Sequence, residues 1–79
     1  MPRFYIHIQN GNGFEPDYEG LELADLESAR REALHAGADI IAQDLKSGCN
    51  VVNVTLFIED GYHTPLMSLP LTAAIKVEG

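Results

Sequence analysis

Histidine is the side chain best suited to acid–base chemistry and metal binding near neutral pH, and the sequence contains three, His7, His35 and His63. They fall in three different predicted elements, and no pair has the His-x-x-x-His spacing that lets two imidazoles bind one metal ion. His35 is expected on the solvent side of a helix and His63 just after the tip of a hairpin, where both are ordinary surface residues. The histidines therefore predict no metal site.

Asp44 lies on the apolar side of the predicted helix, where a buried carboxylate needs a hydrogen-bond partner. We expect it to be a structural residue that fastens the loop after the helix. The alternative is a catalytic general base. That role needs a nucleophile or a second carboxylate nearby, and the sequence places neither beside Asp44.

A polar segment near the amino terminus raises calcium and phosphate binding as hypotheses. Its oxygen donors for calcium are Asn10, Asn12, Asp17 and Glu19. They do not follow the Asp-x-Asn-x-Asn-Gly order of an EF-hand loop. The run Asn10-Gly11-Asn12-Gly13 lacks the GxGxxG spacing, and no helix begins directly after it. The sequence thus predicts no catalytic residue, no metal and no cofactor.

The size and composition of the chain are those of one small domain. It has 79 residues, 46% of them hydrophobic, and we expect a single domain over residues 1–79. Cys49 is the only cysteine, and a lone thiol suits a reducing compartment. The sequence has no run of roughly eighteen apolar residues and no signal-peptide pattern. We therefore expect a soluble cytoplasmic protein with no membrane partner.

The charge of the chain is strongly negative. Its formal net charge is −7, and the segment from Glu15 to Glu27 has six acidic residues and no basic one. The five basic residues are scattered: Arg3, Arg30, Arg31, Lys46 and Lys76. Because nucleic-acid binding normally needs a basic stripe along the phosphate backbone, no nucleic-acid partner is expected.

Hydrophobic periodicity predicts strands on both sides of one long amphipathic helix. The expected elements are strands at residues 3–9, 21–23, 51–59 and 62–69, and a helix at residues 26–47. Asp25 is the natural N-cap of this helix, and Gly48 suits the left-handed position after it. Small residues on the apolar side of the helix, including Gly37, indicate that its axis lies close to the strands.

The carboxyl-terminal part of the chain is less clearly patterned. Asp60-Gly61 favours a two-residue hairpin turn, and Pro65 argues for an edge position of the strand that follows, since proline has no N–H to donate. Residues 71–77 either form a short helical turn opened by Pro70 or add a further strand, and we favour the helical turn. The fold class is α+β. We expect a two-layer domain with an antiparallel sheet of three or four strands, in strand-strand-helix-strand-strand order, and one long helix packed on one face.

Three aromatic side chains, Tyr5, His7 and Phe57, are predicted on the side of their strands that faces away from the helix. If the two strands are neighbours, these side chains form a patch on the uncovered face of the sheet. The alternative is that they are ordinary sheet residues. We interpret the patch as an interaction surface for a second copy of the chain or for another protein.

Short motifs distributed over nearly the whole chain resemble a family of small bacterial proteins that is known only as a domain of unknown function. The residues that carry the resemblance are Met1-Pro2-Arg3-Phe4-Tyr5, His7, Asp17-Tyr18-Glu19-Gly20, Leu23, Asp25, Ala29-Arg30, Ala33, Asp44, Gly48, Asp60-Gly61 and Leu69-Pro70. This resemblance implies a free-standing α/β domain and brings no activity, cofactor or catalytic residue.

A second resemblance, to the amino-terminal fold of HicB-like antitoxins, covers the strand-strand-helix start of the chain. Those proteins bind a partner and neutralise a small ribonuclease toxin. Here Glu22-Leu23-Ala24-Asp25 replaces their proline-glycine turn before the helix, and no DNA-binding segment follows the domain.

The absence of a recognisable reactive site makes a non-catalytic interaction module the leading functional hypothesis, and we expect it to self-associate. A homodimer would use the Tyr5, His7 and Phe57 patch. The alternative is a regulatory or antitoxin-like protein that binds a basic partner through its acidic loop and helix start.

Overall fold

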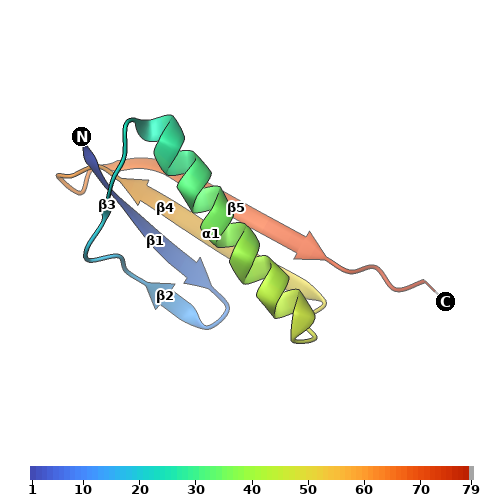
Figure 1. The fold of residues 1–79 in the computed structure, drawn as a ribbon. Helices are drawn as coiled ribbons and strands as arrows, with labels where there is room; N and C mark the ends of the chain where they lie inside the picture. The colour runs from blue at the N-terminus through green and yellow to red at the C-terminus, as the bar shows by residue number, and fades with distance from the viewer. Residues whose placement is uncertain (79) are drawn as a thin grey trace.

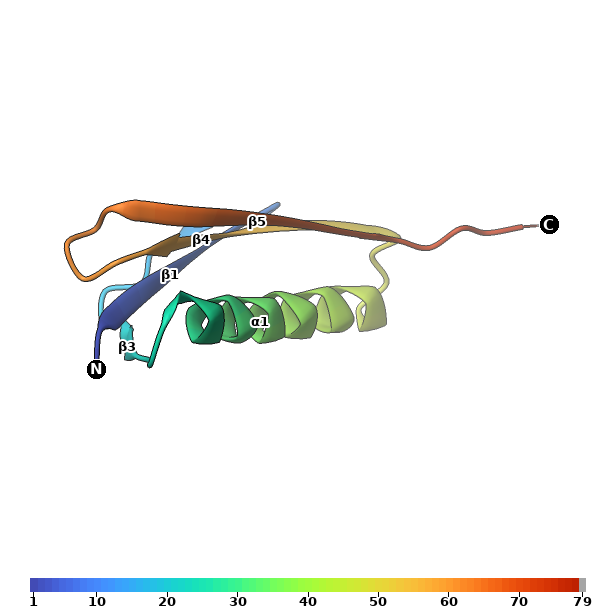
Figure 2. The ribbon, with the colours of Figure 1, turned by 90° about the horizontal axis from the view of Figure 1, so that it is seen from above.

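A computed structural model describes residues 1–78, and one helix covers one face of its antiparallel sheet (Figures 1 and 2). In chain order the elements are β1 (Arg3–Asn10), β2 (Gly13–Glu15), β3 (Leu21–Glu22), α1 (Leu26–Lys46), β4 (Val51–Glu59) and β5 (Pro65–Ala74). The strand order is β2-β1-β4-β5, and β3 also pairs with β1. The predicted α+β class and strand-strand-helix-strand-strand order are confirmed. The sheet has five strands because β2 also pairs with β1.

The helix begins and ends where the sequence predicts. The Asp25 carboxylate accepts a hydrogen bond of 2.8 Å from the Ser28 backbone N–H, which satisfies one of the unpaired donors of the first turn. After the last turn Gly48 has φ of +107°, a conformation that glycine adopts without strain. Among residues 1–78, no helix combines the length and hydrophobicity needed to cross a bilayer.

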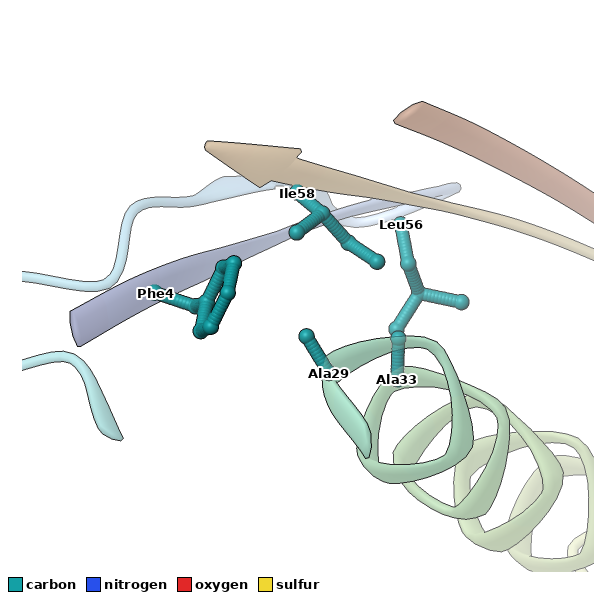
Figure 3. Packing of buried hydrophobic residues seen from close by; sticks show 5 residues of the cluster. All are labelled: Phe4, Ala29, Ala33, Leu56 and Ile58. Atoms are coloured by element: carbon teal, nitrogen blue, oxygen red, sulfur yellow. The ribbon is translucent and has the colours of Figure 1, made fainter. Parts of the chain in front are cut away.

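The centre of the core lies between α1 and the strands β1 and β4. Its centre is formed by Ala29 and Ala33 of the helix, Phe4 of β1, and Leu56 and Ile58 of β4 (Figure 3). The helix contributes only small residues here, so the large side chains of the sheet fill the space between the layers. This packing explains the small-residue side that the sequence shows.

At Gly37 the helix lies in tight contact with side chains of the sheet. A Cβ atom at this position would lie 2.6 Å from Leu71 Cδ1 and 2.8 Å from Leu56 Cδ1. Leu56 is fully buried, so its side chain has little freedom to move aside. The close helix–strand approach that was predicted from this glycine is therefore confirmed.

The prediction of a two-residue turn at Asp60-Gly61 is wrong, because the connection between β4 and β5 spans residues 60–64. The Asp60 carboxylate accepts hydrogen bonds from the backbone N–H groups of Tyr62 at 2.8 Å and Thr64 at 2.9 Å. His63 adopts the left-handed conformation with φ of 63°. An aspartate that bonds the backbone ahead of it holds this longer turn together.

The predicted helical turn at residues 71–77 is also wrong, because β5 continues to Ala74 and pairs with β4 along that length. Leu71 lies opposite Val54 in the sheet and packs against the core, so the strand pattern extends beyond Pro70. The Ile75 N–H donates to the Asn50 carbonyl, which indicates that odd-numbered residues of this segment bond to β4. Pro70 therefore places its missing N–H on the outer edge, as expected for an edge strand.

Replacing Gly37 with valine is expected to lower the free energy of unfolding by about 2 kcal/mol. Overpacking a tight core costs roughly 1–3 kcal/mol, which outweighs the few tenths gained in helix propensity. The exposed neighbour Ala38→Val is the matched control, with an expected loss below about 1 kcal/mol. Urea unfolding measures both, and a Gly37→Val variant as stable as the parent would contradict this packing.

Candidate functional site

We call the sheet face opposite α1 the open face. It carries a cluster of aromatic rings from two segments that are distant in sequence, residues 5–14 and 57–63. His7 of β1 lies directly opposite Phe57 of β4, so two of the three predicted patch residues are cross-strand neighbours. Phe14 of β2 joins them, with its ring centroid 5.7 Å from His7 and 6.3 Å from Phe57. Tyr5 lies opposite Glu59 and stacks on His63 at 4.4 Å. We call these five rings the aromatic cluster: Tyr5, His7, Phe14, Phe57 and His63.

His7 is buried, with 9% of its surface exposed, although its strand face is not covered by the helix. The Asp17 backbone N–H donates to Nδ1 at 2.9 Å, and Nε2 lies 2.8 Å from Glu59 Oε1. Because Nδ1 accepts a hydrogen bond, the ring proton must sit on Nε2, which donates to Glu59. A second proton at Nδ1 would point at the Asp17 N–H and break this bond.

Asp17 fixes the loop that covers His7. Its carboxylate accepts three backbone hydrogen bonds, from Ile6 at 3.1 Å, Glu19 at 3.2 Å and Gly20 at 3.0 Å. Burial alone would raise the pKa of Asp17, but the three N–H donors outweigh it and hold this pKa below its usual value of 3.8. Asp17 is therefore an ionised structural residue.

The same carboxylate completes the outer edge of β1. This edge pairs with β3 at Arg3 and Phe4 and with β2 from Ile8 to Asn10, and Ile6 lies in the gap between them. Asp17 takes the place of a strand by accepting the Ile6 N–H. The edge of β1 is thus occupied from end to end by backbone or side-chain partners.

Glu59 connects the two histidines of the cluster. Its Oε1 atom lies 2.8 Å from His7 Nε2 and 3.0 Å from His63 Nδ1. The hydrogen bond from His7, followed by that from His63, lowers the pKa of Glu59 from its ordinary value of 4.5. The left-handed backbone of His63 turns its ring back toward β1, where it reaches both Glu59 and Tyr5.

Beside Glu59 the open face has a shallow pocket of about 270 Å³. Phe57, Phe14, Pro65 and Met67 supply apolar lining, and Glu59 and His7 lie at one side. Two further residues with polar side chains, Gln9 and Ser68, also line it. The pocket is therefore mainly apolar with one carboxylate.

The cluster has no cysteine beside its histidines. Glu59 and His63 form a carboxylate–imidazole pair, but the only cysteine, Cys49, precedes the opposite end of β4. Among residues 1–78, no group of three or more histidine, cysteine or acidic side chains is arranged to hold a metal ion. The arrangement is suited to hydrogen bonding and ring stacking.

Asp44 lies apart from this cluster, half-buried near the end of α1. Its backbone carbonyl accepts hydrogen bonds from the Ser47 hydroxyl at 2.9 Å and the Cys49 N–H at 3.0 Å. The bonds that fasten the loop after the helix therefore use the main-chain oxygen of Asp44.

Sequence reasoning missed four residues of the site: Phe14, Asp17, Glu59 and His63. Glu59 follows Phe57 by two residues, so the strand period alone places both on one face. The other three needed the turn conformations and the path of the loop after β2, which depend on contacts between distant segments.

Asp17→Asn is expected to lower the free energy of unfolding by about 1–3 kcal/mol near neutral pH, because one amide cannot accept all three backbone bonds. Since folding lowers the pKa of Asp17, its stabilisation is present above pH 3.8 and is lost as the pH falls through the folded-state pKa. The difference between variant and parent should therefore shrink below that pH. Asp39→Asn, on the exposed side of α1, is the control, and equal losses in both variants would contradict this role.

Nitrogen-15 NMR of the imidazole rings should show His7 as the neutral form protonated at Nε2. The reason is the backbone N–H that occupies Nδ1. Long-range nitrogen–proton correlation spectra distinguish the two tautomers directly. A His7 ring protonated at Nδ1 near neutral pH would show that the loop does not bond to it.

Comparison with models of protein families identifies a family for this chain. The model of a family described as a domain of unknown function, DUF6894, matches residues 3–72. No curated protein and no solved structure matches the sequence. The matched region includes every residue of the aromatic cluster as well as Asp17 and Glu59. The chain therefore belongs to the DUF6894 family, a family of domains of unknown function.

Proposed function

We propose that this domain is a non-catalytic protein-interaction module that self-associates through its open face. The observation that carries the proposal is the composition of that face. Across β4 and β5 it presents one charged residue, Glu59, in a chain with 12 acidic and five basic residues. The other residues there include Val51, Asn53, Thr55, Phe57, Pro65, Ser68, Pro70, Thr72 and Ala74.

Charge depletion is what an interface core requires. The central part of protein interfaces is poor in charged residues and rich in aromatic ones. Two copies that each carry a net charge of −7 repel one another, so they associate best through the surface with the fewest acids. Figure 2 shows this face of the sheet uncovered, opposite α1.

The strand edges are less suited to association. The outer edge of β1 is occupied by β2, β3 and Asp17. At the other side of the sheet, Pro70 removes a donor from the outer edge of β5. Proline on an edge strand is a common device against edge-to-edge pairing. The open face is therefore favoured as the contact surface.

The alternative function is a regulatory or antitoxin-like protein that binds a basic partner through the segment from Glu15 to Glu27. Most acids of this segment have partners within the chain. Asp17 bonds the backbone, Asp25 caps α1, Glu22 pairs with Arg3, and Glu27 pairs with Arg30. Four of the six acidic side chains of this segment are thus engaged within the chain, which leaves Glu15 and Glu19 for a basic partner. The open face is therefore the better supported interaction surface. We propose that the module acts in the bacterial cytoplasm, where the exposed thiol of Cys49 stays reduced.

Ser68→Glu tests the proposed face without removing an aromatic side chain. Ser68 is exposed and lies opposite Phe57, so the new carboxylate would lose hydration in the interface. We expect the dissociation constant of the dimer to rise by at least about tenfold, measured by light scattering over a concentration series. Ala38→Glu, which adds the same charge on the outer side of α1, should leave it within about twofold.

Tyr5→Ser with Phe57→Ser extends the test to the predicted patch residues and should also weaken association. The fold of each variant is checked by circular dichroism. A parent protein that stays monomeric at every concentration, or a Ser68→Glu variant with the parent's solution mass, would overturn the proposal.

A further inference from the structure

The pocket beside Glu59 has features that self-association alone does not use. It combines a carboxylate at one side with the rings of Phe57 and Phe14, and no lysine or arginine of the chain lines it. Its volume of about 270 Å³ is below the roughly 300–1,000 Å³ typical of pockets for drug-sized ligands. The pocket therefore has room for one side chain and is small for a nucleotide or a similar cofactor.

Hydrogen bonds fix the position of the Glu59 carboxylate, which gives this pocket its negative charge. Glu59 is 22% exposed, and both histidines bond to the same oxygen, Oε1, so that Oε2 takes part in neither bond. His7 must be neutral while Nδ1 accepts the Asp17 N–H, so it does not cancel the charge of Glu59. The lowered pKa keeps the carboxylate ionised near neutral pH.

The surroundings of Glu59 favour a planar cation. A guanidinium group stacks on aromatic faces and donates two N–H groups to a carboxylate, whereas an ammonium group is a compact point charge. Phe14 is 54% exposed and offers a ring surface to such a group. Pro65 supplies apolar surface for the aliphatic stem of the same side chain.

We propose that the pocket formed by Glu59, Phe57, Phe14, Pro65 and Met67 binds one arginine side chain presented by a partner polypeptide. Charge complementarity selects this occupant, because the pocket is anionic and aromatic in a chain of net charge −7. The proposal goes beyond self-association and does not depend on it, since binding of a single side chain is measurable with monomeric protein.

The probe for this site is N-acetyl-arginine methylamide, titrated into nitrogen-15-labelled protein at about pH 8, where histidine side chains are generally neutral. We expect saturable chemical-shift changes centred on His7, Phe14, Phe57 and Ser68. A dissociation constant on the order of 1–10 mM is expected for one side chain. The citrulline analogue, which has the same shape without the charge, should bind at least about tenfold more weakly.

Glu59→Gln is the decisive variant, because glutamine can still accept the histidine hydrogen bonds through its oxygen. It should weaken binding of the arginine probe at least about tenfold. Glu32→Gln, which removes the same charge on the exposed side of α1, should leave the affinity within about twofold. Phe14→Leu provides a second variant that keeps apolar bulk and loses the ring, and it should weaken binding about threefold or more.

The proposal is overturned if citrulline binds as well as arginine, or if the Glu59→Gln variant keeps the parent affinity. Shift changes spread over the acids of β2 and α1 would also overturn it, since they would indicate diffuse attraction to a negative surface. Light scattering of the same samples keeps the two proposals apart. Because the proposed dimer covers the pocket, the probe is titrated at protein concentrations where light scattering shows a monomer. A monomer that does not bind the probe there contradicts only the arginine site, and a protein that binds it but stays monomeric at every concentration contradicts only self-association.

Discussion

The structure depends on the close packing of one helix against one face of the sheet. Ala29, Ala33 and Gly37 let α1 approach so closely that Leu56 of β4 is fully buried beneath it. Residues 1–78 supply this one helix, and no helix or sheet within them covers the other side. Burial of apolar surface therefore stabilises one side of the sheet, and the other side must be organised by different interactions.

Hydrogen bonds between polar groups organise the open face. The loop after β2 folds back along β1, where the Asp17 carboxylate bonds three backbone N–H groups and its own N–H bonds His7. His7 then orients Glu59 through a hydrogen bond. Glu59 also accepts a hydrogen bond from His63, which lies in the connection between β4 and β5. Segments that are distant in sequence are joined by side chains whose donors and acceptors match. This network buries a histidine without the cover of a second layer.

The fold could be predicted from the sequence because its main signals are local. Each of these signals comes from residues close together in sequence. They are the period-two pattern of β4, the Asp25 cap and the small-residue side of α1. The same local reading failed after Pro70, because pairing with β4 extends the strand whatever the preference of that segment. It also placed His7 on an exposed surface, since nothing near His7 in sequence shows that Asp17 covers it. The Tyr5, His7 and Phe57 positions were found by strand period, which also places Glu59 on their face, whereas His63 joins them only through the tertiary fold.

We propose that the open face contacts a second copy of the chain, and isotope-filtered NOE spectra can detect that contact residue by residue. Labelled and unlabelled protein are mixed, so that only contacts between copies give signals. We expect intermolecular signals at Phe57, Tyr5 and Thr55. Signals confined to the backbone of β5 or to the outer side of α1, or none at millimolar concentration, would contradict it.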